Sequence, residues 1–372
     1  MLASRLRLPI LDRYVLAEFA GPFGFGLSAF TLIFAATQLL QIGRLVSDQH
    51  APLLAAIEVF LWSLPGEVVL VIPMAMLLGT LLAVQRLSGE SEVTAMKAGG
   101  ISFMRAVAPL LVGGVLLSVA TFALQEKVVP YAAGQVTQIQ NDALKHVSVF
   151  NQDLITHASL PGGGRQITIA TAFDPLDRTL LNVTLVQYDV RGNPSYEAFA
   201  DRARFEADQW TLENVSEYQF SPDGEVYVLP KEAEQKISLY QTPTDIVKRM
   251  SGDDPQQMSL AQIADIVRTG QLTDNEVRKY TTVFQQKIAQ PFACFVFVLI
   301  AIPFGLRTVR GGGSASLGFG LAVAIVFVYY VVATVCSYLG EAFLPLAALW
   351  AWMPNLIFTA IGVARLRRAA AV

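Results

Sequence analysis

The stretch RLSGESEVTAMKAGGIS, residues 86–102, decides how this chain is organised. It separates two long apolar runs, and it is too short and too polar to cross a bilayer, which takes about 20 apolar residues. It is therefore expected at a membrane surface. Ser88 fits the N-cap of a short helix over residues 88–98, with acidic side chains in its first turn. Lys97 stands in the last turn and glycines 99 and 100 end the helix. A plain connection between two membrane spans is the alternative interpretation.

The composition is that of an integral membrane protein. Of 372 residues, 53% are hydrophobic and only 15% are charged, and the mean hydropathy is +0.46. The net charge of −3 is the sum of an acidic part and a basic part of the chain. Residues 127–286 carry 14 basic and 21 acidic side chains, and the remainder carries 13 basic and 9 acidic ones. Cys294 and Cys336 both stand in apolar runs. We therefore expect neither a disulfide framework nor a metal site built on cysteine in the polar part.

Three uncharged runs precede the polar middle of the chain. Residues 19–43 predict the first span, 68–85 the second and 106–125 the third, each long enough for a hydrocarbon core of about 30 Å. Residues 51–64 are apolar but contain Glu58, and Pro65-Gly66-Glu67 follow them. We interpret this segment as a surface or outer-leaflet piece that ends before span two.

The middle of the chain changes to short segments rich in Val, Ile, Thr, Tyr and Phe, separated by turn clusters such as PGGG and SPDG. This texture predicts an all-β domain. The alternation of apolar residues changes phase near Val186, which indicates a bulge. Residues 251–279 look like a partly helical return segment. The candidate strands are residues 166–170, 180–190, 196–205, 209–220, 225–229 and 235–240.

Three more uncharged runs, with cores at 288–306, 317–338 and 342–364, complete six predicted spans. The fold class is therefore an α-helical polytopic membrane protein with 3+3 spans and an inserted all-β domain. The predicted organisation is spans one to three with the short helix in 1–126, the β domain in 127–250, the return segment in 251–279 and spans four to six in 280–372.

Basic residues predict the orientation. With six spans both termini lie on one side, and that side collects nearly all the arginines and lysines that flank the spans, while the short opposite loops hold only Arg44. By the positive-inside rule we expect cytosolic termini, a cytosolic helix at 88–98 and a β domain outside. The basic residues on the predicted cytosolic side are Arg5, Arg7, Arg13, Arg86, Lys97, Arg105, Arg307, Arg310, Arg365, Arg367 and Arg368.

No motif in the sequence indicates catalysis. The glycine runs at 162–164 and 311–313 lack the lysine and hydroxyl of a phosphate-binding loop, and His50, His146 and His157 form neither a metal spacing nor a nucleophile triad. The charged residues near the spans stand toward span ends, which argues against an ion-coupled carrier with a site at the bilayer midplane.

Two sets of span residues are candidates for binding. Gln38, Gln41 and Arg44 form a polar stripe at the outer end of span one that could meet a lipid head group or simply anchor the helix, and we add Lys287 at the start of span four. Small residues four apart predict close helix packing, either at a subunit interface or inside the chain. These residues are Gly21, Gly24 and Ser28 near span one and Ser314, Gly318 and Ala322 near span five.

Three stretches resemble the lipopolysaccharide-export permeases LptF and LptG, and the resemblance covers the whole chain. They are LDRYVLAEFAGPFGFGL (11–27), LPGEVVLVIPMAMLLGTLLAVQRLSGESEVTAMKAGGIS (64–102) and QKIAQPFACFVFVLIAIPFGL (286–306). LDRY is closer to LptG and GESEVTAMKAGG to LptF, so both paralogues stay open. The resemblance implies that the outer domain is a β-jellyroll and that Arg44 stands where the family has basic residues facing the lipid head group, whereas Gln38 and Gln41 are uncharged.

The resemblance also implies partners. The chain would pair with a paralogous permease, dock on an LptB-type ATPase dimer that binds the ATP, and pass lipopolysaccharide to an LptC/LptA-type periplasmic bridge, with no cofactor of its own and no nucleic acid. The helix at 88–98 is similar to the family's coupling helix. Its expected ATPase-facing residues are Glu90, Glu92, Met96 and Lys97, with Glu92 as the acidic contact. A membrane-anchored binding protein and, below it, a secondary transporter are the competing function classes.

Overall fold

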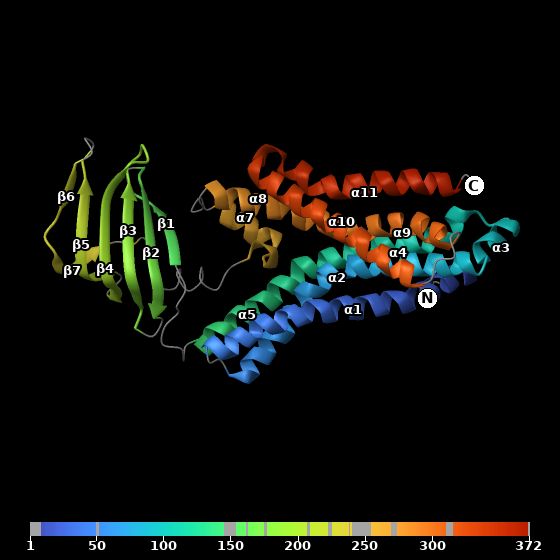
Figure 1. Ribbon diagram of the computed structural model, residues 1–372, viewed down its shortest axis with the longest axis horizontal. Coiled ribbons are helices and arrows are strands. Elements are labelled where there is room, and N and C mark those ends of the chain that lie inside the picture. Colours follow the sequence, from blue (N-terminus) through green and yellow to red (C-terminus); the bar gives the residue numbers. More distant parts are fainter. Residues whose placement is uncertain are drawn as a thin grey trace, which may run out of the picture.

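The computed structural model is a bundle of long helices with an antiparallel sheet at one end, while both termini and a short helix lie at the other end (Figure 1). The residues that it describes are 9–49, 52–144, 154–160, 163–174, 177–206, 209–221, 225–237, 239, 254–268, 274–309 and 315–370. Six helices are long and apolar enough to cross a membrane, which confirms the predicted fold class. They span Ile10–Leu40, Leu53–Gly89, Phe103–Ile139, Asn275–Leu306, Leu317–Ala342 and Leu344–Arg368.

The N-terminal half of the bundle contains five helices and one π-helical turn. They are α1 (Ile10–Gln49), α2 (Leu53–Gly89), α3 (Glu92–Ala98), α4 (Phe103–Ala123), the π turn η1 (Leu124–Val128) and α5 (Val129–Leu144). The predicted break at Pro65 is wrong, because α2 is one helix of 37 residues that contains both Pro65 and Pro73. Neighbouring helices surround α2, and in an apolar environment a helix is the one local conformation that satisfies most of its own backbone groups.

The C-terminal half follows the sheet. It consists of the 3-10 turn η2 (Pro255–Gln257), α7 (Leu260–Arg268), α8 (Asp274–Ala289), η3 (Gln290–Phe292), α9 (Ala293–Val309), α10 (Ala315–Ala342), η4 (Leu344–Leu346) and α11 (Ala347–Ala370). The return segment is partly helical as predicted, and Ile263 on α7 is fully buried. Spans three and four extend beyond their uncharged runs, because α5 and α8 continue as amphipathic helices outside the apolar part.

Helices α2 and α9 form the centre of the bundle, and α1, α4, α10 and α11 pack around them. Glycines permit the closest approaches. A Cβ on Gly79 of α2 would come within 2.9 Å of Phe19 and Phe23 on α1, and one on Gly305 of α9 would meet the carbonyl oxygen of Leu81 at 3.0 Å. In contrast, only 17% of the most apolar window of the first span, on α1, and of the fifth span, on α10, is buried.

Seven strands form one antiparallel sheet in the order β1-β2-β3-β4-β5-β6, and β7 pairs with β5. The strands are β1 (Leu154–Ser159), β2 (Arg165–Asp174), β3 (Thr179–Tyr188), β4 (Pro194–Glu206), β5 (Gln209–Phe220), β6 (Val226–Val228) and β7 (Glu232–Ile237). A register shift at Gln187/Tyr188 confirms the bulge predicted near Val186.

The inserted β domain is confirmed, although strand β1 was missed because the segment LITHAS carries little β signal beyond its alternation. Its core packs around the fully buried rings of Trp210 and Phe173. The described strands make a single sheet and not the two sheets of a jellyroll, so the jellyroll stays a prediction of the resemblance.

Candidate functional site

The surface stretch folds as a short, exposed helix between spans two and three. Helix α3 has seven residues, none of them buried. At its end, the N–H of Ile101 donates to the carbonyl of Met96 and the N–H of Gly100 donates to that of Lys97, with Gly100 at φ +82°. This is a Schellman stop, in which glycine takes the left-handed conformation without strain. The predicted end of the helix is therefore confirmed.

The predicted start of this helix is wrong. Ser88 lies in the last turn of α2, which continues to Gly89, and α3 begins at Glu92. Ser91 takes the N-cap position with φ +60° and makes no side-chain cap hydrogen bond. Arg86 and Glu90, one turn apart, form an ion pair that extends α2 past the predicted boundary. Glu90 therefore belongs to the end of α2, and Glu92 alone remains in the first turn of α3.

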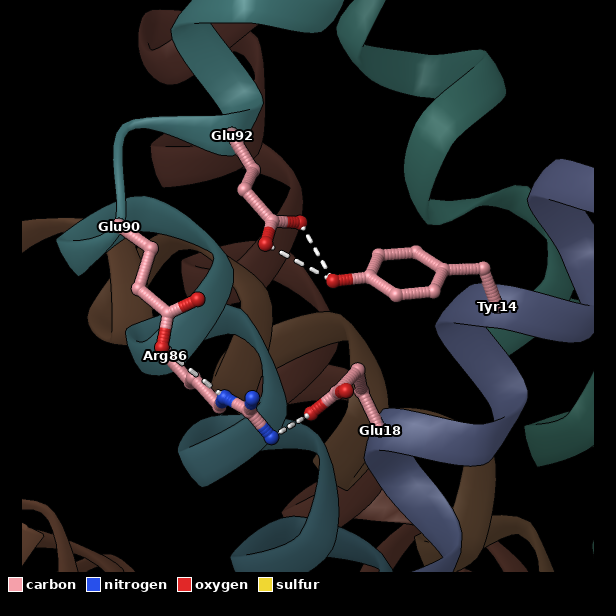
Figure 2. Close-up of polar contacts among 5 residues, drawn as sticks. All are labelled: Tyr14, Glu18, Arg86, Glu90 and Glu92. Carbon is pink, nitrogen blue, oxygen red and sulfur yellow. Dashed lines mark hydrogen bonds and ion pairs between the residues drawn. The ribbon is translucent and has the colours of Figure 1, made fainter.

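Hydrogen bonds and ion pairs between polar side chains connect the first turns of α1 to α3 and to the end of α2 (Figure 2). The hydroxyl of Tyr14 donates to both carboxylate oxygens of Glu92, at 2.8 Å each. Arg86 Nη1 lies 2.5 Å from Glu18 Oε2, and Arg86 Nε lies 3.2 Å from Glu90 Oε1. Arg86 thus joins α1 to the end of α2, while Tyr14 joins α1 to α3.

A third contact reaches α4. Arg105 Nη1, in the first turn of α4, lies 2.5 Å from Asp12 Oδ1 of α1. Helix α1 is therefore bonded to each of the three segments that make up the turn between spans two and three. We call Asp12, Tyr14 and Glu18 with their partners Arg105, Glu92 and Arg86 the α1 contact set. A displacement of α3 relative to α1 has to break the bond between Tyr14 and Glu92 or move α1 with it, while the other two pairs hold α1 to the ends of α2 and α4.

Tyr14 and Glu18 were not among the functional residues predicted from the sequence. They stand four apart in LDRYVLAEF and so share one face of α1, which is a signal that could have found them. The remaining candidates on α3 are accessible. Met96 is half-buried, and Lys97 is exposed with its Nζ 5.9 Å from the centre of the Phe103 ring.

The four lipid-binding candidates have different positions. Gln38 Nε2 donates to Glu67 Oε1 of α2 at 2.7 Å, so its amide is held inside the chain. The side chains of Gln41 and Arg44 lie outside the part of the chain that the structure describes. Lys287 is 1% exposed and its Nζ donates to the carbonyl of Gln256 at 2.8 Å. The assignment of Lys287 to a lipid contact is therefore wrong, because its ammonium is buried between α8 and the return segment.

The predicted subunit-interface residues also separate into two groups. Gly21, Gly24 and Ser28 are exposed on α1, and a Cβ on either glycine would meet nothing within 4 Å. Gly318 and Ala322 are buried, and a Cβ on Gly318 would come within 2.2 Å of Gln85 on α2. These two residues serve internal packing, so their assignment to a subunit interface is wrong; Ser314 lies outside the described residues.

Six membrane-crossing helices, a short surface helix between the second and third, and a sheet inserted between the third and fourth define a multi-pass membrane protein with an inserted β domain. The chain belongs to the lipopolysaccharide export system permease LptF/LptG family, whose model matches residues 13–368. This confirms the family resemblance found in the sequence. As a member of this family it is a lipopolysaccharide export permease and a multi-pass protein of the inner membrane.

Curated relatives agree with this family. The chain is 22% identical over 353 residues to the lipopolysaccharide export system permease protein LptG of Haemophilus influenzae, covering 94% of this chain and 95% of the relative. It is 23% identical over 287 residues to LptG of Escherichia coli K12, covering 73% of this chain and 74% of the relative.

Proposed function

We propose that this chain is the permease subunit that takes lipopolysaccharide from the outer leaflet of the inner membrane and passes it to a periplasmic bridge, driven by a separate ATPase. The observation that carries the proposal is the α1 contact set, which links the exposed helix α3 and the ends of α2 and α4 beside it to the outward-facing helix α1. A permease of this kind needs a surface that receives force and a helix that moves in response. Here the two are bonded to each other.

In this proposal α3 and both termini are cytosolic and the sheet is periplasmic. The basic residues at the α3 end of the bundle support this orientation, since Arg86, Lys97 and Arg105 lie there with Arg365 and the two arginines after it near the C-terminus. Helix α3 would dock on an LptB-type ATPase dimer. Glu92 is the contact residue because it is the only carboxylate on α3.

Helices α1 and α10 are the proposed contacts to a paralogous permease and to lipid. Their large apolar side chains are more exposed than those of α2 and α9, and in a membrane such faces meet either acyl chains or another helix. Gly21, Gly24 and Ser28 on α1 form a small-residue row on which a second helix can pack closely. Narrowing of the space between paired α1 and α10 helices would then push lipid toward the sheet and on to an LptC/LptA-type bridge.

Purification from mild detergent tests this function directly. The wild-type chain should copurify with a nucleotide-binding subunit and a paralogous permease, and the Glu92→Ala variant should lose the nucleotide-binding subunit or lipid export. A charge-assisted contact buried at an interface costs about 2 to 5 kcal/mol when one partner is removed. Glu58→Ala is the matched control, because Glu58 is an exposed carboxylate on the same connected helices and lies far along α2 from α3.

Each result has a defined meaning. A chain that copurifies with no nucleotide-binding subunit contradicts the proposal and favours a membrane anchor or a secondary transporter. A Glu92→Ala variant that assembles and exports at the wild-type rate removes Glu92 from the coupling contact.

A further inference from the structure

A cavity of about 680 Å³ opens among the outer parts of α1, α2 and α5, with η2 and η3 at its rim. Its volume falls in the range of small-molecule sites in proteins, about 300 to 1,000 Å³. It lies inside one chain, so it is separate from the proposed space between paired α1 and α10 helices. The lining mixes the ring of Trp62 with polar side chains that include Gln38, Glu67, Gln125 and Asp254.

The polar lining offers mainly hydrogen-bond acceptors. Glu67 uses one carboxylate oxygen to accept from Gln38, which leaves its second oxygen available to a ligand. Asp254 uses Oδ1 to accept from the backbone N–H of Gln256, and it lies near the buried ammonium of Lys287, which donates to the carbonyl of Gln256. None of the described lining residues is lysine, arginine or histidine. The cavity therefore favours a ligand that donates hydrogen bonds over phosphate, which would meet the like charge of the Glu67 carboxylate.

Gln125 gives this cavity a second, independent sign of a ligand site. It is 5% exposed, and its Oε1 has no hydrogen-bond partner among the described residues. A buried acceptor without a donor costs free energy that a ligand hydroxyl would recover. Gln125 stands in the π turn η1, an irregular helical turn of a type found often at functional sites. The next residue, Glu126, accepts from the N–H of Leu260, so the turn is also fixed to the return segment.

Trp62 indicates which class of hydrogen-bond-donating ligand fits the cavity. Its ring makes an edge contact with Tyr131, the two centroids lying 5.7 Å apart. A sugar ring has an apolar face that packs on an aromatic side chain and hydroxyl groups that donate to carboxylate and amide oxygens. We propose that this cavity binds an unphosphorylated sugar unit of the exported glycolipid. The inference rests on the proposed function and adds a saccharide site within a single permease chain.

Calorimetric titration of the detergent-solubilised full chain tests this proposal. The first probe is lipopolysaccharide from which the acyl chains have been removed, and the second is intact lipopolysaccharide. Gln125→Leu should weaken binding of the deacylated saccharide about fivefold, the effect of one neutral hydrogen bond. Glu67→Gln should weaken it about tenfold, because hydrogen bonds to a charged acceptor are stronger. Glu58→Gln, an exposed carboxylate on the same helix outside the cavity, should leave it unchanged.

Thermal unfolding measurements show whether a variant loses saccharide binding because a contact is lost or because the chain is destabilised. Gln125→Leu removes a buried oxygen without a partner, so its thermal unfolding temperature should equal or exceed that of the wild type. Saccharide binding that both cavity variants leave intact would overturn the proposal. The proposal is also overturned if the deacylated saccharide does not bind to the wild-type chain. Binding of choline, a simple ammonium probe, in place of the saccharide would overturn it as well. If the wild-type chain copurifies with its ATPase while the saccharide result is negative, the cavity proposal fails and the proposed function stands.

Discussion

The hydroxyl of Tyr14 on α1 donates to both carboxylate oxygens of Glu92 on α3 at 2.8 Å, across 78 positions of the sequence. The same carboxylate is the proposed contact to the ATPase. In that proposal one acidic group has two partners, the first span of its own chain, which the structure shows, and a cytosolic subunit. An arginine of the ATPase that approached Glu92 would either share this carboxylate with Tyr14 or displace the phenol, and both events would be transmitted to α1.

Tyr14→Phe tests whether movement of α3 is passed to α1 without changing the residues of α3 that would bind the ATPase. The substitution removes one hydroxyl and keeps the ring. We expect the variant to retain its ATPase partner but to export about fivefold less lipid per ATP hydrolysed, the effect of one lost hydrogen bond. Lipid release and phosphate release from proteoliposomes measure this ratio. Tyr227→Phe is the matched control, since the hydroxyl of Tyr227 on β6 also donates to a carboxylate, that of Glu225, and lies on the sheet away from α3. Equal export per ATP in the wild type and Tyr14→Phe would show that this contact transmits nothing.

Cysteine labelling tests the orientation on which the proposed function depends. Cys294 and Cys336 are both buried, so a new exposed cysteine should dominate the signal. Ala95→Cys on α3 should react with a membrane-impermeant maleimide only after the inner membrane has been opened. Val228→Cys on β6, which is 71% exposed, should react in intact spheroplasts. The reverse pattern would place α3 outside the cell and end the coupling proposal.

Gly79 tests the packing of the bundle. A Cβ at this position would lie 2.9 Å from side-chain atoms of Phe19 and Phe23 and 3.0 Å from the backbone of α1. We expect Gly79→Ala to lower the free energy of unfolding by about 1 to 3 kcal/mol, because overpacking forces α1 away from α2. Thermal unfolding in detergent measures this. Gly113→Ala on α4, where a Cβ meets nothing within 4 Å, should cause no such loss.

We expect Asp189 to make the stability of the sheet depend on pH in the acid range. Backbone N–H groups of Asn193 and Arg191 donate to Asp189 Oδ1 in the turn between β3 and β4, and the bond from Asn193 is the main reason that the pKa of this carboxyl lies below its ordinary value of 3.8. Since the folded-state pKa is lowered, the stabilisation is complete above the ordinary value. It is lost as the pH falls through the folded-state pKa.

In a chain whose Trp62, Trp350 and Trp352 are replaced by phenylalanine, the fluorescence of the buried Trp210 should therefore report weaker resistance of the sheet to urea as the pH falls below about 4. Asp189→Asn keeps an oxygen that can accept from the turn but cannot be ionised, so its stability should vary less over this pH range. An Asp189→Asn variant with the same pH dependence as the wild type would assign the acid sensitivity to other carboxyls.

The sequence alone determined the features that depend on one segment and its solvent. Uncharged runs such as 19–43 and 106–125 predicted spans because an apolar helix of that length matches the hydrocarbon core whatever its neighbours are. Gly99 and Gly100 predicted the end of α3 for a local reason as well, since the Schellman stop needs a residue at positive φ. Turn clusters and β-branched residues located six of the seven strands in the same way.

Only the tertiary structure decided which faces meet. Residue spacing was compatible with Gly318 at a subunit interface, with Lys287 at a lipid, and with a helix break at Pro65, whereas packing against α2, η2 and the rest of the bundle settled each position differently. Tyr14 and Glu92 meet because α1 lies against the turn between spans two and three. Such contacts depend on the packing of whole helices, a long-range property that no single segment encodes.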